Sequence, residues 1–245
     1  MIGNPAATAW GLHRCGAIPE AADILARLQA ETRLYHSDVD AIWLDLFTGE
    51  LTVAQYVAVL MRVYGFKSSI EAALAYTPRL QSMVDLRGRV HSGLIAQDLM
   101  GLGFGTAQVA GLPLCPIAPF ATPAEALGWM YVVQRSSALH AQIKQHVEAR
   151  LPQVRCGRGL SYLSISSARA VTLASELGTA LEVVVRDERT ADHVISGACD
   201  AFRRLVDWFQ PAQPRHTRPA ETDLTNDLRG ARAAAPEPES RDEPE

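Results

Sequence analysis

The sequence has few cysteines and lacks a long apolar run. The four cysteines, Cys15, Cys115, Cys156 and Cys199, are widely spaced, which excludes the closely spaced thiols of zinc sites and redox motifs and predicts reduced thiols. The first residues contain no basic region leading into an apolar one, and no later stretch is long and apolar enough to span a bilayer. We therefore expect a cytoplasmic protein without membrane insertion.

An excess of positive charge is also missing. The formal net charge is −4 at pH 7, so the chain has no general basic surface, and nucleic acid is not expected as a partner. The composition, 48% hydrophobic and 20% charged residues over 245 positions, is typical of a globular protein and is enough for one sizeable core.

Several common catalytic motifs are absent. The sequence contains no Gly-rich phosphate loop, no Gly-x-Ser-x-Gly elbow and no His-Glu-x-x-His motif. No glutamate is followed by a histidine three residues later, and helical di-iron sites use that step. These absences exclude the usual nucleotide, serine-hydrolase and zinc-protease sites and disfavour a di-metal site.

The apolar pattern predicts an all-α fold. Apolar residues recur three, four or seven positions apart over 24–46, which indicates one long helix or two consecutive ones, beginning near Pro19 and ending at Thr48. Further helices are expected from Thr52 to before Pro78, within 86–105, from 123 to before Pro152, and over about 163–186 and 189–209. The stretch 111–123 carries four prolines and is expected to be extended.

The domain organisation follows from a change in composition. Residues 1–18 are expected to be an N-terminal extension and residues 19–210 a single domain of about six helices. Residues 211–245 hold six of the 14 prolines and end in an acidic stretch without large apolar residues. Such a segment cannot bury enough surface to fold alone, so we expect a disordered tail.

His36 is the histidine that raises the question of a ligand site. It follows Thr32 by one helical turn, on the stretch with helical apolar spacing. A single histidine on such a face is more often a hydrogen-bonded core residue than a ligand. The residues alone therefore leave both interpretations open.

A family resemblance favours the ligand. The pattern Leu28-x-x-x-Thr32-x-x-x-His36 resembles the proximal-histidine helix of the bacterial, biliverdin-producing heme oxygenases. Four later segments resemble further helices of that family in the same order, namely "LTVAQYVAVLMRVYGFKSSIEAAL", "VHSGLIAQDLMGLG", "ALGWMYVVQRSSALHAQI" and "ACDAFRRLVDWF". The resemblance covers most of 20–210 and implies a heme oxygenase-like multi-helix bundle.

The resemblance also implies roles for particular residues. His36 would be the proximal ligand of the heme iron, with Thr32 and Tyr35 as orienting neighbours. Either Arg33 or Arg27 would pair with a heme propionate, unless both are solvated surface charges. Heme would be substrate and cofactor, cleaved to biliverdin with release of iron and CO, and a separate reductase would supply electrons.

The distal helix departs from the family pattern. Bacterial members read Tyr-Val-x-Glu-Gly-Ser-x-Leu-Gly-Gly, whereas this chain reads "YVVQRSSALH" from Tyr131 to His140. Arg135, Leu139 and His140 thus replace glycines whose absent side chains let the backbone approach the heme. Arg135, Ser136 and Leu139 are the candidate distal catalytic positions, and Arg135 and Leu139 are expected to share one helix face.

Two outcomes of this departure stay open. In the first, side chains fill the distal pocket, and the protein is a non-catalytic module that binds heme, a bilin or another protein. In the second, heme binds in a shifted pose with Arg135 facing a propionate or bound oxygen. A second axial bond from His140 is a weaker alternative, because most such histidines point to solvent. A third class, thiaminase-like or quinone-cofactor-synthesis enzymes of related topology, would not need His36.

Other polar and aromatic residues receive plainer interpretations. Tyr131 is expected to be a core aromatic, as is Trp129, with a role lining the ligand pocket as the alternative. Asp98 is expected to brace a neighbouring helix. The remaining histidines in polar helical surroundings, His91, His146 and His193, are expected to face water.

Overall fold

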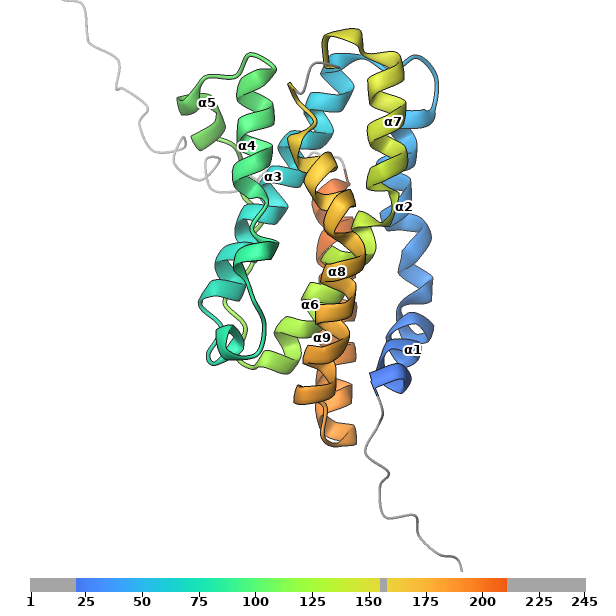
Figure 1. Ribbon diagram of the computed structural model, residues 1–245, viewed down its shortest axis with the longest axis vertical. Helices are drawn as coiled ribbons and strands as arrows, with labels where there is room; N and C mark the ends of the chain where they lie inside the picture. Colours follow the sequence, from blue (N-terminus) through green and yellow to red (C-terminus); the bar gives the residue numbers. More distant parts are fainter. Residues whose placement is uncertain (1–20, 155–157, 211–245) are drawn as a thin grey trace, which may run out of the picture. The chain divides into compact units, whose positions relative to one another are not determined.

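The computed structural model describes residues 21–154 and 158–210, which all belong to one unit of the chain (Figure 1). Across these ranges the secondary structure consists of nine α-helices and six short 3₁₀ helices, without a β-strand. The all-α prediction is therefore confirmed. The predicted extension over 1–18 and tail over 211–245 lie outside the described residues, as do Cys15 and Cys156.

The helices match the expected segments closely. Their bounds are α1 Ala21–Thr32, α2 His36–Leu44, α3 Val53–Ala75, α4 Ser92–Gly101, α5 Thr106–Ala110, α6 Pro123–Ser136, α7 His140–Arg150, α8 Ser161–Val184 and α9 Glu188–Phe209. The Thr52 hydroxyl caps α3 and the Thr122 hydroxyl caps α6, where Pro123 occupies the first turn. Both starts were predicted, because a hydroxyl oxygen before an apolar periodic run satisfies free backbone N–H groups.

The number of helices exceeds the predicted six; the first predicted segment forms two consecutive helices, one of its two expected forms, and the segment beginning at Pro123 is broken. A 3₁₀ turn, Arg33–Tyr35, separates α1 from α2 immediately before His36, and another, Ser137–Leu139, separates α6 from α7. Side-chain hydroxyls compete for backbone carbonyls at both breaks: Thr32 donates to the carbonyl of Leu28, and Ser137 donates to that of Gln134 at 2.7 Å. The bend in the distal segment therefore occurs without the glycines of the family pattern.

Two glycines let α6 cross α9 at close range. A Cβ atom placed on Gly128 would lie 2.1 Å from the carbonyl oxygen of Val194, and one on Gly197 would lie 2.6 Å from that of Glu125. Only glycine permits this backbone approach. The crossing holds α6 at a defined depth in the bundle, and Figure 1 shows α6, α8 and α9 in the middle of the view, between α1 and α2 on one side and α4 and α5 on the other.

The core consists of two apolar clusters. One lies mainly between α1, α6, α8 and α9 and includes Ile24, Leu127 and Phe202, while the other joins α3, α4 and α7 and includes Tyr56 and Ile143. Trp129 and Tyr131, each 7% exposed, belong to the first cluster, as predicted for core aromatics. The first cluster supports the walls of the cavity described next.

Candidate functional site

A cavity of about 700 Å³ lies between α1, the start of α2, α6 and α8. Its polar lining includes His36, Arg33, Gln134 and Arg135, and its apolar wall is formed by Leu25, Tyr131, Ala138, Ala170, Val171, Ala174 and Leu177. The alanines of α8 and of the turn after α6 leave the space open, because larger side chains at these positions would fill it. The volume lies within the range of small-molecule binding sites.

The His36 ring is held by Thr32. Its Nε2 atom lies 3.1 Å from the Thr32 hydroxyl oxygen, and that hydroxyl donates its own hydrogen to the carbonyl of Leu28. The oxygen therefore accepts from Nε2–H, which places the imidazole lone pair on Nδ1. Nδ1 forms no hydrogen bond with the residues that the structure describes, so one ring nitrogen is available to a ligand.

Aromatic packing and charge complete the setting of His36. The centroid of its ring lies 5.5 Å from that of Phe202, which also stacks on Tyr35 at 5.7 Å. Burial lowers the pKa of His36, the Arg135 guanidinium lowers it further, and the Asp40 carboxylate opposes both. The neutral form is favoured, and this is the form that binds metals.

Arg135 connects the distal helix to the helix that begins at His36. Its two terminal nitrogens donate to the two carboxylate oxygens of Asp40 at 3.0 and 2.8 Å, and about a quarter of each side chain is exposed. Because Asp40 lies one turn after His36, this bidentate pair places a fixed positive charge at the cavity wall near the histidine. Arg33, by contrast, lines the cavity and is exposed.

The other distal candidates lie away from this cavity. Ser136 lines a separate enclosed space of about 30 Å³, and Leu139 packs against the second core cluster. Arg135 and Leu139 were expected to share one face, but the 3₁₀ turn beginning at Ser137 changes the helical register between them. Only Arg135 of these three lines the His36 cavity.

Two predictions about histidines are wrong. His140 is 1% exposed and its Nδ1 lies 2.8 Å from the Ser166 hydroxyl, so it points neither to solvent nor into the His36 cavity. His91 is 5% exposed rather than in water. Both lie where the other helices of the bundle cover them, which a polar local sequence does not reveal.

Three further interpretations concern contacts between helices. Asp98 accepts hydrogen bonds from the backbone N–H groups of Ser161 and Tyr162 at 2.9 and 2.8 Å, so it braces the start of α8 as predicted. Arg27 pairs with Glu188 and Asp192 of α9, whereas Arg33 lines the cavity and forms no ion pair with the residues that the structure describes.

Sequence reasoning did not single out Asp40 or Phe202. Asp40 lies four residues after His36, so helical spacing would have placed both on one face. Phe202 comes from α9, more than 160 residues away in sequence, and no local pattern connects it to His36. Its contact depends on the packing of α9 against α1 and α2.

The described residues contain no group of three or more histidine, cysteine, aspartate or glutamate side chains that could hold a metal ion. His36 can therefore act only as a single ligand to a metal that brings its other ligands with it. Among the helices over 21–154 and 158–210, none combines the length and apolar character needed to cross a bilayer.

The fold and site define a helical protein in which His36, oriented by Thr32, lies at the wall of an open cavity. The family model for heme oxygenase matches residues 22–211, and the chain belongs to the heme oxygenase family. The structure is also similar to a solved structure of heme oxygenase from Neisseria meningitidis, determined with NO and CO bound. The TM-score is 0.61 at 19% identity, covering 78% of this chain and 94% of that chain. No curated protein matches the chain.

Proposed function

We propose that this chain binds heme in the cavity beside His36, with His36 as the axial ligand of the iron, and cleaves it to biliverdin with release of iron and CO. The observation that carries the proposal is the arrangement of His36, whose ring is oriented by Thr32 while its other nitrogen stays free of protein partners. Membership of the heme oxygenase family supports the same ligand.

The cavity fits the chemistry of heme. A heme is a flat apolar macrocycle with two carboxylates, and the cavity combines an apolar wall on α8 with the exposed cation Arg33, while the guanidinium of Arg135 is already paired with Asp40. A guanidinium binds a carboxylate through two parallel hydrogen bonds. The lowered pKa of His36 keeps its imidazole neutral and able to coordinate iron.

When bound, heme would supply both the iron that activates oxygen and the macrocycle that is cleaved, with electrons from a separate reductase. The protein's part is to hold and orient. Thr32 holds the His36 ring, and the Gln134 amide, which donates to the carbonyl of Ala170 at 2.8 Å, ties the distal helix to α8. The α8 wall keeps bulk water from one side of the cavity.

A second function of the same pocket is favoured by the Arg135–Asp40 pair. The pair holds a guanidinium on the distal helix where the family pattern has a glycine, so heme would share the cavity with a fixed cation. A pocket arranged in this way would bind heme or a bilin without cleaving the macrocycle. The two functions make different predictions for turnover.

Hemin titration with single-turnover measurement distinguishes these functions. The reconstituted protein is reduced with ascorbate in air with catalase present, while the Soret band and the red absorption of a bilin are followed. His36→Ala is compared with His193→Ala, which removes an exposed histidine of α9 and serves as the matched control.

Three results are distinguishable. A Soret band that decays into bilin absorption, and that His36→Ala weakens while His193→Ala does not, supports cleavage of heme. A stable Soret band with the same dependence on His36 supports the binding protein without turnover. A Soret band equally strong in His36→Ala, or no heme complex at all, refutes His36 as the ligand.

A further inference from the structure

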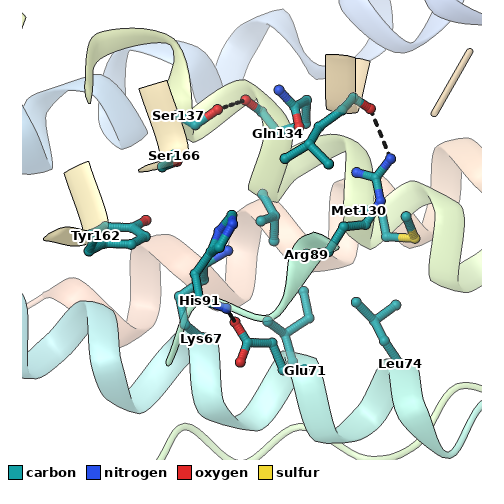
Figure 2. A pocket seen from close by; sticks show the side chains of 13 residues that line it. Lys67, Glu71, Leu74, Arg89, His91, Met130, Gln134, Ser137, Tyr162 and Ser166 are labelled. Atoms are coloured by element: carbon teal, nitrogen blue, oxygen red, sulfur yellow. Dashed lines mark hydrogen bonds between the residues drawn. The ribbon is translucent and has the colours of Figure 1, made fainter. Parts of the chain in front are cut away.

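A second, enclosed cavity lies on the other side of the distal helix. It has a volume of about 30 Å³ and is bounded by α3, by the segment that leads into α4, by α6 and by α8. Its polar lining includes Lys67, Arg89, His91 and Tyr162, and Gln134 and Ser137 border both this cavity and the one beside His36. Figure 2 shows Lys67 and His91 close together, with Tyr162 on one side and Arg89 on the other.

Lys67 is a buried cation whose charged form is favoured by the Glu71 carboxylate, one helical turn further along α3. Its side chain lies in the α3 wall with the residue 6% exposed, and it forms no hydrogen bond or ion pair within the part of the chain that the structure describes. Glu71 is the lining carboxylate nearest in sequence, but its oxygens accept from the backbone N–H groups of His91 and Ser92 and from the Ser92 hydroxyl. A buried charge without a hydrogen bond is costly, so this ammonium requires a further partner.

The neighbouring Arg89 and His91 side chains add further hydrogen-bond donors to the cavity. The Arg89 guanidinium pairs with Glu176 at 3.3 Å and donates to the carbonyl of Leu173 at 2.9 Å, yet its Nε–H group is buried without a partner. Both ring nitrogens of His91 are also buried and unpartnered. Three side chains around one small space therefore present hydrogens that no described protein atom accepts.

The electrostatic setting of the cavity is positive. Burial first, and then the charges of Lys67, Arg169 and Arg89, lower the pKa of His91 to about 4, against an opposing hydrogen-bond contribution from the Gly88 backbone. Burial also lowers the pKa of Lys67, which Glu71 opposes and Arg89 reinforces. Water inside the cavity would accept hydrogen bonds from these donors, whereas an anion would also add to the partial compensation of their charge by Glu71 and Glu176.

We propose that this cavity is a binding site for one small monovalent anion of halide size, held by Lys67 with Arg89 and His91. A buried water needs about 10–15 Å³ of accessible space, so a cavity of about 30 Å³ has room for a monatomic anion. The anion would compensate the Lys67 ammonium and accept from Arg89 Nε–H and from one N–H of His91. The site is independent of heme, because it lies outside the His36 cavity.

Bromide tests the site directly, because its anomalous scattering distinguishes it from water. Crystals of the full chain without heme are grown in sodium bromide, and the anomalous difference map is calculated at the bromine absorption edge. The expected result is a peak inside the cavity within hydrogen-bonding distance of Lys67 Nζ. A cavity that contains only water under these conditions overturns the proposal.

A solution measurement tests whether the anion matters without a crystal. The thermal midpoint of the chain is compared in sodium bromide and in sodium gluconate of the same ionic strength, since gluconate is too large for the cavity. A bromide concentration 100-fold above the dissociation constant is expected to raise the midpoint by roughly 5 °C or more. The rise is expected to disappear in Lys67→Met, which replaces the buried ammonium by an apolar chain of similar length.

Lys144→Met is the matched control, because Lys144 lies on α7 in an ion pair with Glu148, away from the cavity. It is expected to keep the full response to bromide. An equal response in Lys67→Met and in the control, or no difference between bromide and gluconate in the unchanged chain, overturns the proposal. The crystallographic result does not depend on whether Lys67→Met folds.

Discussion

The ion pair between Arg135 and Asp40 is expected to couple the distal helix to α2 by about 1–2 kcal/mol. Two unit charges about 4 Å apart attract by roughly 4 kcal/mol at an effective dielectric constant of about 20. Ordering the arginine side chain costs up to about 2 kcal/mol of this attraction. Two hydrogen bonds of 3.0 and 2.8 Å, with about a quarter of each side chain exposed, favour a net stabilisation above that of a surface pair.

A double-mutant cycle measures this coupling. The free energies of unfolding in urea are determined for the unchanged chain, Arg135→Ala, Asp40→Ala and the double variant. The cycle for Arg203 and Asp200, a pair on α9 with more than half of each side chain exposed, serves as control and is expected to give under about 0.5 kcal/mol. A coupling for Arg135 and Asp40 no larger than the control would refute the reasoning.

The same single variants are expected to move the pKa of His36 in opposite directions. Arg135 lowers this pKa and Asp40 raises it, so Arg135→Ala should raise it and Asp40→Ala should lower it. NMR titration of the imidazole Cε1–H signal measures both. Because only neutral imidazole coordinates iron, heme is released when His36 is protonated at low pH. Arg135→Ala should therefore shift the midpoint of this acid release to a higher pH.

Three other perturbations test the packing, the ligand orientation and the buried histidine. Gly197→Ala should destabilise the chain by at least about 2 kcal/mol in urea unfolding, because its Cβ meets backbone at 2.6 Å, whereas Gly178→Ala, with its nearest contact at 3.9 Å, should be neutral or stabilising. Thr32→Val should weaken hemin binding in a Soret titration, because it removes the oxygen that orients the His36 ring. Thr32→Ser keeps that oxygen and should bind hemin normally. Equal hemin affinities of the two variants would contradict this role of Thr32. Burial lowers the pKa of His140 to about 3 from 6.5, so below pH 6.5 the unfolded chain binds more protons than the folded chain. The free energy of unfolding should therefore fall by up to about 1.4 kcal/mol for each pH unit below 6.5. His140→Gln should reduce this slope.

The sequence by itself determined most of the fold. Helix starts at Thr52 and Thr122 depend on local hydrogen bonds between a hydroxyl and the first backbone N–H groups, and the apolar stripes depend on the helical repeat. Both are encoded within a few residues. The helix expected over about 163–186 is present as α8 and includes the β-branched Val183 and Val184, whereas the third valine of that run, Val185, is extended.

Tertiary structure decided which side chains meet. The ligand candidate His36 could be picked out from spacing and resemblance, but its neighbour Phe202 is brought to it by the packing of α9 against α1 and α2. The 3₁₀ turn after α6 separates Leu139 from Arg135, and distant helices bury Lys67. Helical periodicity predicts which face of a helix a residue lies on. Which other helix packs against that face depends on how closely the two backbones approach, and that distance is set by contacts between residues far apart in sequence.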